Sequence, residues 1–353
     1  MKREIPKLKD YCIKISSGGT PSRDTNEYFE NGTIPWVKSK ELKSNIILKT
    51  EEKITLQGLK NSSTKLYPID TVLLAMYGVN IGQVGYLGIE ATINQAICGI
   101  ITNKKILDPK FLYYYLTSIP SYFDSVSFGA AQQNINQDLI KNLKIEIPEL
   151  ITQQLIASIL SAYDDLIEVN NQRIKLLKET ARELYKEWFV RMRFPGYKKA
   201  KFVKGVPEGI GEVKYFKDFI KLNRGFDLPE EKIKEGSYPV IASTSIKGYH
   251  NQYKVKGPII TTGRSGSLGT VLFVNQDGWP LNTSLYVKDF KSNEPLYLYY
   301  TLKLIDFESF NTGAGVPTLN QNHLHKLKMW VADEVLQKKF KKWLSQCSNK
   351  LRF

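Results

Sequence analysis

The sequence contains an internal repeat, which constrains the fold more than any other feature of the chain. Residues 111–116, Phe-Leu-Tyr-Tyr-Tyr-Leu, match residues 297–302, Tyr-Leu-Tyr-Tyr-Thr-Leu, at an offset of 186 residues. Residues 135–144 match residues 319–328 at an offset of 184. Two nearly equal offsets over separate blocks indicate a duplicated domain.

Each half of the chain alternates short apolar runs with Gly, Asn and Ser turns, a pattern typical of β-strands. The aromatic blocks at 111 and 297 have helical spacing instead, and we interpret their tyrosines as core residues. The sequence therefore predicts an α+β fold with two repeated β-rich globular domains, residues 1–148 and 195–332. The expected strands lie at 71–76, 84–89 and 97–101 in the first copy and at 255–261, 270–274 and 284–287 in the second.

A long helix is predicted between the two domains. Residues 149–194 contain neither Gly nor Pro, whereas Pro148 and Pro195 flank them, and such a segment favours one continuous helix. Its apolar positions step by four and three residues, as in a coiled coil, with Asn170 as the one polar member. The apolar members are Ile156, Leu160, Tyr163, Ile167, Ile174, Leu177, Ala181, Leu184 and Trp188.

The repeat supplies a partner for this helix in residues 333–353. The same spacing returns there at Phe340, Leu344, Cys347 and Leu351, so we expect two antiparallel coiled-coil helices, the second one short. The short helix can cover only the C-terminal part of the first. Apolar residues near the start of the first helix, from Ile156 to Ile167, are therefore expected either to contact another chain or to pair with a longer second helix that has been cut short in this sequence.

The charge balance favours a polyanionic partner. The chain has 50 Lys and Arg against 35 Asp and Glu, a net charge of +15, and the linker 191–204 carries six basic residues and no acidic one. That linker is either a solvated connection or a strap that contacts phosphates. A hydrophobic share of 42% excludes wholesale disorder. No apolar run is long enough to span a membrane and the N-terminal residues lack the apolar stretch of a signal peptide, so we expect a cytoplasmic protein.

The sequence offers no strong catalytic motif. It lacks the Gly-rich phosphate loop of ATP-dependent motors, the Asn-Pro-Pro-Tyr element of amino methyltransferases and a GxGxxG segment. Glu-x-Lys triplets at 41–43, 51–53 and 230–232 leave a metal-dependent nuclease as one rival hypothesis. A metal site at the histidines is not expected, because His323 occupies a repeat position where the first copy has Leu139.

Several motifs resemble the specificity subunits of type I restriction-modification enzymes. Gly18-Gly-Thr-Pro-Ser22 and Ile34-Pro-Trp-Val37 resemble the opening of a target recognition domain, and residues 153–165 resemble the helix entrance of that family. The resemblance implies a non-catalytic subunit that reads a bipartite double-stranded DNA target, one half-site per domain, with the helices as spacers.

The resemblance also implies partners for the chain. Two methyltransferase subunits would dock on the helices and restriction subunits that translocate DNA would join them, so S-adenosylmethionine, ATP and Mg²⁺ would belong to those subunits and not to this chain. A second half-type specificity chain is an alternative partner. The alternative function is a coiled-coil scaffold that binds nucleic acid only non-specifically.

Base readout requires side chains with paired donors and acceptors on loops that reach a groove. Such residues gather where the two copies diverge, and the loop 263–269 aligns with the loop 78–82. Arg264 is the strongest single candidate, because arginine binds guanine with two hydrogen bonds. The DNA-binding candidates are Lys38, Ser39, Lys40, Tyr77, Asn80, Gln132, Gln133 and Asn134 in the first domain and Ser243, Thr244, Ser245, Arg264, Ser265 and Ser267 in the second.

Overall fold

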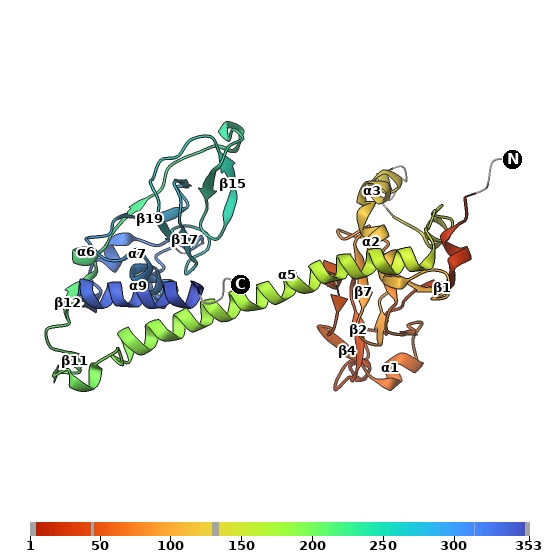
Figure 1. Cartoon of the computed structure of the whole chain (residues 1–353), viewed down its shortest axis with the longest axis horizontal. Helices are drawn as coiled ribbons and strands as arrows, with labels where there is room; N and C mark the ends of the chain where they lie inside the picture. Colours follow the sequence, from red (N-terminus) through yellow and green to blue (C-terminus); the bar gives the residue numbers. More distant parts are fainter. Residues whose placement is uncertain (1–4, 44–45, 129–133, 314, 350–353) are drawn as a thin grey trace. The chain divides into compact units, whose positions relative to one another are not determined.

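A computed structural model describes residues 5–43, 46–128, 134–313 and 315–349 of the chain (Figure 1). Contacts within the chain divide it into two compact units, residues 1–170, here called unit 1, and residues 171–353, here called unit 2. The predictions for Gln132, Gln133 and Leu351 lie outside the described residues. Among the described residues, no helix is long and apolar enough to cross a membrane.

Unit 1 is built on two sheets. The larger has the strand order β1-β9-β6-β7-β3, and the smaller has the order β4-β2-β8-β5. The strands are β1 (Cys12–Ser17), β2 (Ile34–Val37), β3 (Ile46–Ile47), β4 (Glu52–Ile54), β5 (Leu66–Tyr67), β6 (Val72–Ala75), β7 (Val84–Leu87), β8 (Ala91–Ile93) and β9 (Ile97–Thr102). The helices are η1 (Leu8–Tyr11), η2 (Asn26–Tyr28), η3 (Ser39–Lys43), α1 (Leu56–Lys60), α2 (Pro109–Ser118), α3 (Pro120–Phe128) and α4 (Gln137–Lys141).

The core of unit 1 forms between the larger sheet and α2. Leu74 and Ile100 of the sheet pack with Leu112 and Leu116 of the helix, and all four are almost fully buried. Asp108 begins α2 by accepting a hydrogen bond from the backbone N–H of Phe111, and Pro109 fills the first helical position, so local sequence fixes where the helix starts.

Unit 2 repeats this arrangement. Its sheets have the orders β13-β19-β16-β17 and β15-β14-β18, and the pairs β10-β11 and β12-β20 form two further ribbons. The strands are β10 (Phe202–Val203), β11 (Val206–Pro207), β12 (Gly211–Tyr215), β13 (Lys221–Arg224), β14 (Tyr238–Ile241), β15 (Ile246–His250), β16 (Ile259–Gly263), β17 (Val271–Val274), β18 (Trp279–Pro280), β19 (Ser284–Asp289) and β20 (Lys328–Ala332). The helices are η5 (Tyr197–Lys199), α6 (Phe216–Phe219), η6 (Glu230–Lys232), α7 (Pro295–Leu304), η7 (Phe307–Phe310), α8 (Gln321–Leu324) and α9 (Glu334–Asn349).

The topology confirms the duplication predicted from the sequence. β1, β9, β6 and β7 of unit 1 have the same neighbours as β13, β19, β16 and β17 of unit 2. β2 pairs in parallel with β8 just as β14 pairs in parallel with β18. Each of the six apolar runs expected as strands overlaps a strand, although β16 begins four residues later than the expected run 255–261, and the two aromatic blocks form α2 and α7.

The long helix is shorter than expected. It runs as α5 (Leu150–Tyr185) and continues as one π-helical segment, η4 (Lys186–Val190), so it ends before residue 194. The sequence offers no Gly or Pro to end it earlier, but Trp188 and Phe189 are buried in the core of unit 2 and Met192 has a positive φ of 56°. The left-handed backbone conformation at Met192 therefore ends the helix before the proline does.

Within unit 2, the end of α5 packs antiparallel to α9, as predicted (Figure 1). Phe340 of α9 is fully buried, and its ring lies 5.8 Å from the rings of both Tyr185 and Trp188. Ala181 is buried, and Leu184 and Leu344 are partly buried against the same core. Leu177 is half-buried, whereas Ile174 is 48% exposed, so the covered part of the stripe begins near Leu177.

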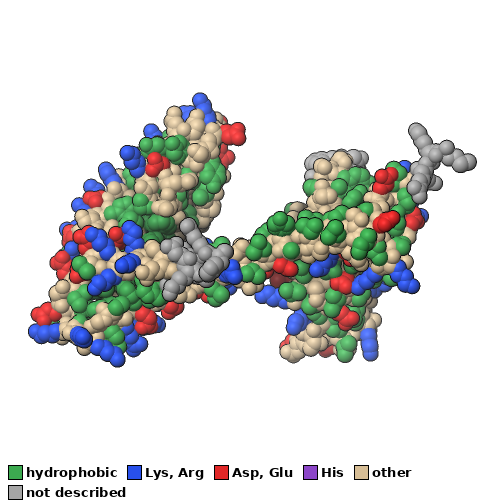
Figure 2. Space-filling model, viewed as in Figure 1, with side chains coloured by type: hydrophobic (Ala, Val, Ile, Leu, Met, Phe, Trp, Pro, Cys, Tyr) green, Lys and Arg blue, Asp and Glu red, His purple; other side chains and the backbone are tan. Residues whose placement is uncertain are grey.

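The N-terminal half of α5 keeps an apolar strip at the surface. Ile156 and Leu160 are 36% and 38% exposed, and Tyr163 and Ile167 are 64% and 59% exposed. Asn170 is exposed as well. Figure 2 shows hydrophobic side chains gathered along this helix. Within the described residues of unit 1, no segment covers this strip, as expected from the shortness of the second helix.

One buried glutamine fixes the start of each long helix. The Gln153 side chain in α5 accepts a hydrogen bond from the backbone N–H of Asp108 (2.9 Å) and donates to the carbonyl oxygens of Ile106 (3.0 Å) and Pro148 (2.8 Å). In unit 2, Gln337 of α9 binds the backbone N–H of Glu294 (2.9 Å) and the carbonyl oxygen of Ala332 (2.8 Å).

Both glutamines are almost fully buried, with exposed fractions of 0% and 2%. They are separated by 184 residues, the offset of the repeat itself. Each clamps the first turn of its helix to the start of α2 or α7, so we refer to them as the glutamine clamps.

Candidate nucleic-acid interface

Two hairpin loops occupy equivalent places in the two units. Residues 76–83 connect β6 to β7, and residues 264–270 connect β16 to β17. Both strand pairs are antiparallel and occupy the same place in the strand order, so each loop lies at the equivalent end of the larger sheet in its unit. This confirms that the segment 78–82 corresponds to the segment 263–269.

The same backbone hydrogen bonds hold both loops. In unit 1 the N–H of Ile135 donates to the carbonyl oxygen of Met76 at 2.7 Å, and in unit 2 the N–H of Leu319 donates to that of Arg264 at 2.9 Å. The bridge between Tyr77 and Asn134 has its counterpart in the bridge between Ser265 and Thr318. The segment before α4 or α8 therefore supports each loop in the same way.

Glycines with positive φ stand at both ends of each loop. Gly78 and Gly266 have φ values of +85° and +89°, and Gly82 and Gly269 have values of +76° and +82°. Residues with a Cβ atom rarely adopt a positive φ, which explains why glycine recurs at these positions. Between the paired glycines, unit 1 has three residues and unit 2 has two.

The loop of unit 2 presents three of the predicted DNA-binding residues. Arg264 and Ser265 are half-buried and Ser267 is exposed. The Arg264 guanidinium donates a hydrogen bond to the carbonyl oxygen of Asn282 at 3.2 Å, and its backbone N–H donates to Thr283. This contact leaves other guanidinium donors for a ligand, because arginine carries five N–H groups.

The corresponding loop of unit 1 presents a different surface. Tyr77 is half-buried and Asn134 is exposed, and the bridge between them brings these two predicted residues together. Asn80 is only 6% exposed, so its side chain offers little surface to a ligand.

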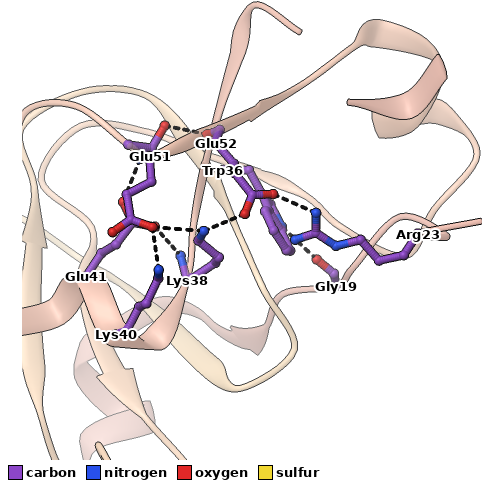
Figure 3. Close-up of polar contacts among 9 residues, drawn as sticks. Gly19, Arg23, Trp36, Lys38, Lys40, Glu41, Glu51 and Glu52 are labelled. Atoms are coloured by element: carbon purple, nitrogen blue, oxygen red, sulfur yellow. Dashed lines mark hydrogen bonds and ion pairs between the residues drawn. The ribbon is translucent and has the colours of Figure 1, made fainter. Parts of the chain in front are cut away.

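Lys38, at the end of β2, is paired within unit 1 (Figure 3). Its ammonium group lies 3.0 Å from a carboxylate oxygen of Glu51 and 2.5 Å from one of Glu52, and the side chain is only 16% exposed. Burial lowers the pKa of Lys38, but the hydrogen bonds to Glu52 and Glu51 raise it by more, so the net pKa is raised. Hydrogen bonds from Lys40 and Lys38 lower the pKa of Glu51, and hydrogen bonds from Arg23 and Lys38 lower the pKa of Glu52.

These pairs change what the two lysines offer to DNA. Lys40 is 57% exposed and lies 2.6 Å from Glu51, so it can exchange this carboxylate for a phosphate more easily than Lys38 can. Hydrogen bonds from Arg23 and both lysines hold the two glutamates ionised, so their charge offsets positive charge at this end of β2.

The motif residues at the opening of unit 1 have structural roles. The indole N–H of Trp36 donates to the carbonyl oxygen of Gly19 at 3.1 Å (Figure 3). The Arg23 guanidinium lies 4.9 Å from the Trp36 ring and 4.3 Å from the Phe29 ring. A Cβ added at Gly18 would lie 1.9 Å from a backbone oxygen, so only glycine fits there.

The remaining predicted residues follow matched strands. Ser39 is half-buried at the start of η3, directly after β2, and the candidates 243–245 form the turn after β14. In that turn the N–H of Ala242 donates to the carbonyl oxygen of Ser245 at 2.9 Å. Ser243 is half-buried, whereas Thr244 and Ser245 are exposed. Because β2 and β14 belong to the smaller sheets, these residues form a second group, separate in topology from the hairpin loops.

The Glu-x-Lys triplets show no metal-binding geometry in the described parts of the chain. Both carboxylate oxygens of Glu41 accept backbone N–H groups, from Lys38 and from Glu51, each at 2.9 Å. No group of three His, Cys, Asp or Glu residues among the described residues is placed to hold a metal ion. The first triplet therefore stabilises a turn, which gives the nuclease hypothesis no support.

Comparison with known proteins connects this architecture to one family. The family model described as "Type I restriction modification DNA specificity domain" matches residues 3–179 and 211–352. The chain is 31% identical over 243 residues to the type I restriction enzyme MjaIX specificity subunit of Methanocaldococcus jannaschii, an alignment that covers 65% of this chain and 54% of that protein. It is 30% identical over 158 residues to the EcoR124I/EcoR124II specificity subunit of Escherichia coli, covering 43% of this chain and 39% of that protein.

The chain thus spans about half the length, or less, of these curated relatives. The crystal structure of the S subunit of a type I restriction-modification system from M. genitalium has the same fold. It matches 99% of this chain and 91% of its own, with a TM-score of 0.62 and 17% identity.

Proposed function

Because the chain belongs to the family of type I restriction-modification DNA specificity domains, we propose that it selects the DNA target of such a system by reading a bipartite double-stranded site. Each β-rich unit reads one half-site. Members of this family are specificity subunits rather than catalytic subunits, as the sequence motifs implied.

The observation that carries this proposal is the duplicated hairpin loop. Two loops with the same backbone support and the same glycine pair differ in the residues between those glycines. Two loops with the same backbone support but different side chains are expected of a protein that reads two different half-sites, because base contacts depend on the exposed side chains. Arg264 is the leading base-contacting candidate in unit 2, since arginine pairs with guanine.

We further propose that methyltransferase subunits cover the apolar strip on α5, from Ile156 to Ile167, and that restriction subunits join them. A strip of this length exposed along a helix favours coverage by protein. S-adenosylmethionine, ATP and Mg²⁺ would bind to those subunits. A second half-type specificity chain is the alternative occupant, and the site of action would be cytoplasmic DNA.

The test is to co-express the chain with its cognate methyltransferase subunit in a host free of DNA methylation and to map modified bases across the genome. The expected result is methylation at a split motif, two short half-sites separated by a fixed gap. A known methyltransferase and specificity pair serves as the positive control. Absence of any motif, with that control working, would contradict the proposal.

The scaffold hypothesis predicts a different result, because exposed apolar residues and a net charge of +15 fit it as well. A scaffold would bind unrelated duplexes equally, with an affinity that falls steeply as salt increases. Competition between specific and random duplexes at one salt concentration separates the two functions.

A further inference from the structure

The loop between β6 and β7 holds a valine almost entirely in solvent. Val79 is 98% exposed, more than any other large hydrophobic side chain among the described residues. Single exposed apolar residues are common on protein surfaces and carry little meaning alone. The surroundings of Val79 are what distinguish it.

The loop that carries Val79 is fixed by its own backbone. The N–H of Ile81 donates to the carbonyl oxygen of Gly78 at 3.2 Å, that of Gly82 to Ala75 at 3.0 Å, and that of Gln83 to Asn80 at 3.0 Å. The neighbouring side chains point inward, since Asn80 is 6% exposed and Ile81 packs against the core. Val79 is thus the side chain at the tip that the loop presents outward.

In the repeat, the residue of unit 2 that is equivalent to Val79 is polar. Counting from the glycines with φ near +85°, Val79 follows Gly78 as Ser267 follows Gly266. Ser267 is exposed and is one of the predicted base-contacting residues. A residue of opposite polarity at the same point of the same frame indicates that the two loops contact different chemical groups.

We propose that Val79 is a specificity-determining residue that contacts the 5-methyl group of a thymine in the major groove of the half-site read by unit 1. This inference rests on the proposed function. The thymine methyl is the one apolar group that base edges expose in the major groove, and a small apolar side chain is its ordinary partner. Burying one methyl group changes affinity by about fourfold. The requirement for paired hydrogen-bond donors and acceptors does not select Val79 from the sequence, because its side chain is apolar.

The experiment uses the full chain in complex with its methyltransferase subunit and measures binding to duplexes that carry the mapped target. Deoxyuridine replaces each thymine of the target in turn, which removes only the methyl group. For the wild-type chain, one replacement in one half-site is expected to weaken binding about fourfold. Val79→Ala shortens the side chain by two methyl groups, so it should weaken binding to the thymine duplex and reduce the preference for thymine over uracil at that position.

Ile13→Ala in β1 is the matched control. Ile13 is also strongly exposed, at 72%, but lies outside the hairpin loop, so this variant should keep the wild-type preference for thymine. Circular dichroism and thermal unfolding show whether both variants are folded. Ser267→Ala should leave the thymine position unchanged and alter the other half-site.

The outcomes separate this inference from the proposed function. If the wild-type complex binds every duplex with the same affinity, both the proposed function and the role of Val79 are refuted. If it selects a bipartite target but tolerates uracil at every position, or if Val79→Ala keeps the wild-type ratio between thymine and uracil, the role of Val79 alone is refuted. A half-site with no thymine at any specified position refutes it as well.

Discussion

Replacing Gln153 by alanine tests whether the glutamine clamp fixes the start of α5. The side chain makes three hydrogen bonds, of 2.9, 3.0 and 2.8 Å, and all three partners are backbone groups. Gln153→Ala removes the bonds and leaves one N–H and two carbonyl oxygens without that partner. The partners lie at the start of α2 and at the entrance to α5, so both helix starts are affected.

The magnitude follows from burial. Gln153 is 0% exposed, and a buried polar group left without its partner costs about 1–3 kcal/mol. The three costs do not add fully, because a water molecule can enter the space of the lost side chain and bind more than one group. We therefore expect a loss of about 3 kcal/mol in the free energy of unfolding of unit 1. For a unit of this size, that corresponds to a fall in Tm of about 6–12 °C.

The assay combines urea unfolding with hydrogen exchange of individual peptides. Exchange should rise in the peptides that contain the start of α2 and the start of α5, and α9 should be unaffected. Gln154→Ala is the matched control, since Gln154 is the next residue of the same helix and is exposed. Its effect is expected to stay within about 0.5 kcal/mol.

Gln153→Glu sharpens the test. The introduced carboxylate can still accept the N–H of Asp108, but it faces the carbonyl oxygens of Ile106 and Pro148 without a donor. Protonation would restore one donor, so the folded state should raise the pKa of this carboxyl above its ordinary value of about 4.3. The variant should therefore be least destabilised at acid pH and lose stability as the pH rises. Equal stability of Gln153→Ala and Gln154→Ala, or no pH dependence of Gln153→Glu relative to wild type, would refute the clamp.

Three further predictions concern other contacts. Tyr185→Phe removes the 2.7 Å hydrogen bond to Thr301 in the core of unit 2 and should lower its free energy of unfolding by about 1 kcal/mol; unchanged urea unfolding would contradict this. The pKa of Glu52 is lowered from 4.5 by hydrogen bonds from its two basic neighbours, so its stabilisation is present above that value and disappears as the pH falls. Glu52→Gln should accordingly be less stable than wild type at pH 7 and nearly equal to it under strongly acidic conditions, a difference that thermal unfolding at both pH values measures. Arg264→Ala should cost about 1–3 kcal/mol of binding and relax one base position, whereas equal weakening on every duplex would identify a phosphate contact instead.

The sequence predicted the parts of the fold in which apolar residues recur at regular spacing. Strands of the larger sheets, the helices α2 and α7, and the long helix all came from apolar spacing, and the duplication came from the offsets between matching blocks. The end of the long helix was placed too late, because Met192 adopts a left-handed backbone conformation and neither Gly nor Pro marks that position in the sequence.

The candidate interface was harder to predict than the fold. Lys38 seemed free for DNA, yet the pairing of β2 with β4 brings Glu51 and Glu52 to it from 13 and 14 residues away. The glutamine clamp was equally hidden, because its partners are backbone groups, which are the same in every sequence. A regular offset of 184 between Gln153 and Gln337 was the one available signal.

The way each hairpin loop is held explains how two copies of one frame can serve different contacts. The support comes from backbone hydrogen bonds and from glycines with positive φ, and neither depends on the side chains between them. Substitution at the tip therefore costs little stability, whereas substitution of Gly78 or Gly266 would force a side chain into the left-handed region. Since the fold does not constrain Val79 or Ser267, the identity of each would be free to follow the group that we propose it contacts. Under the proposed function, a frame that is insensitive to its tip residues would allow a duplicated domain to acquire two separate specificities.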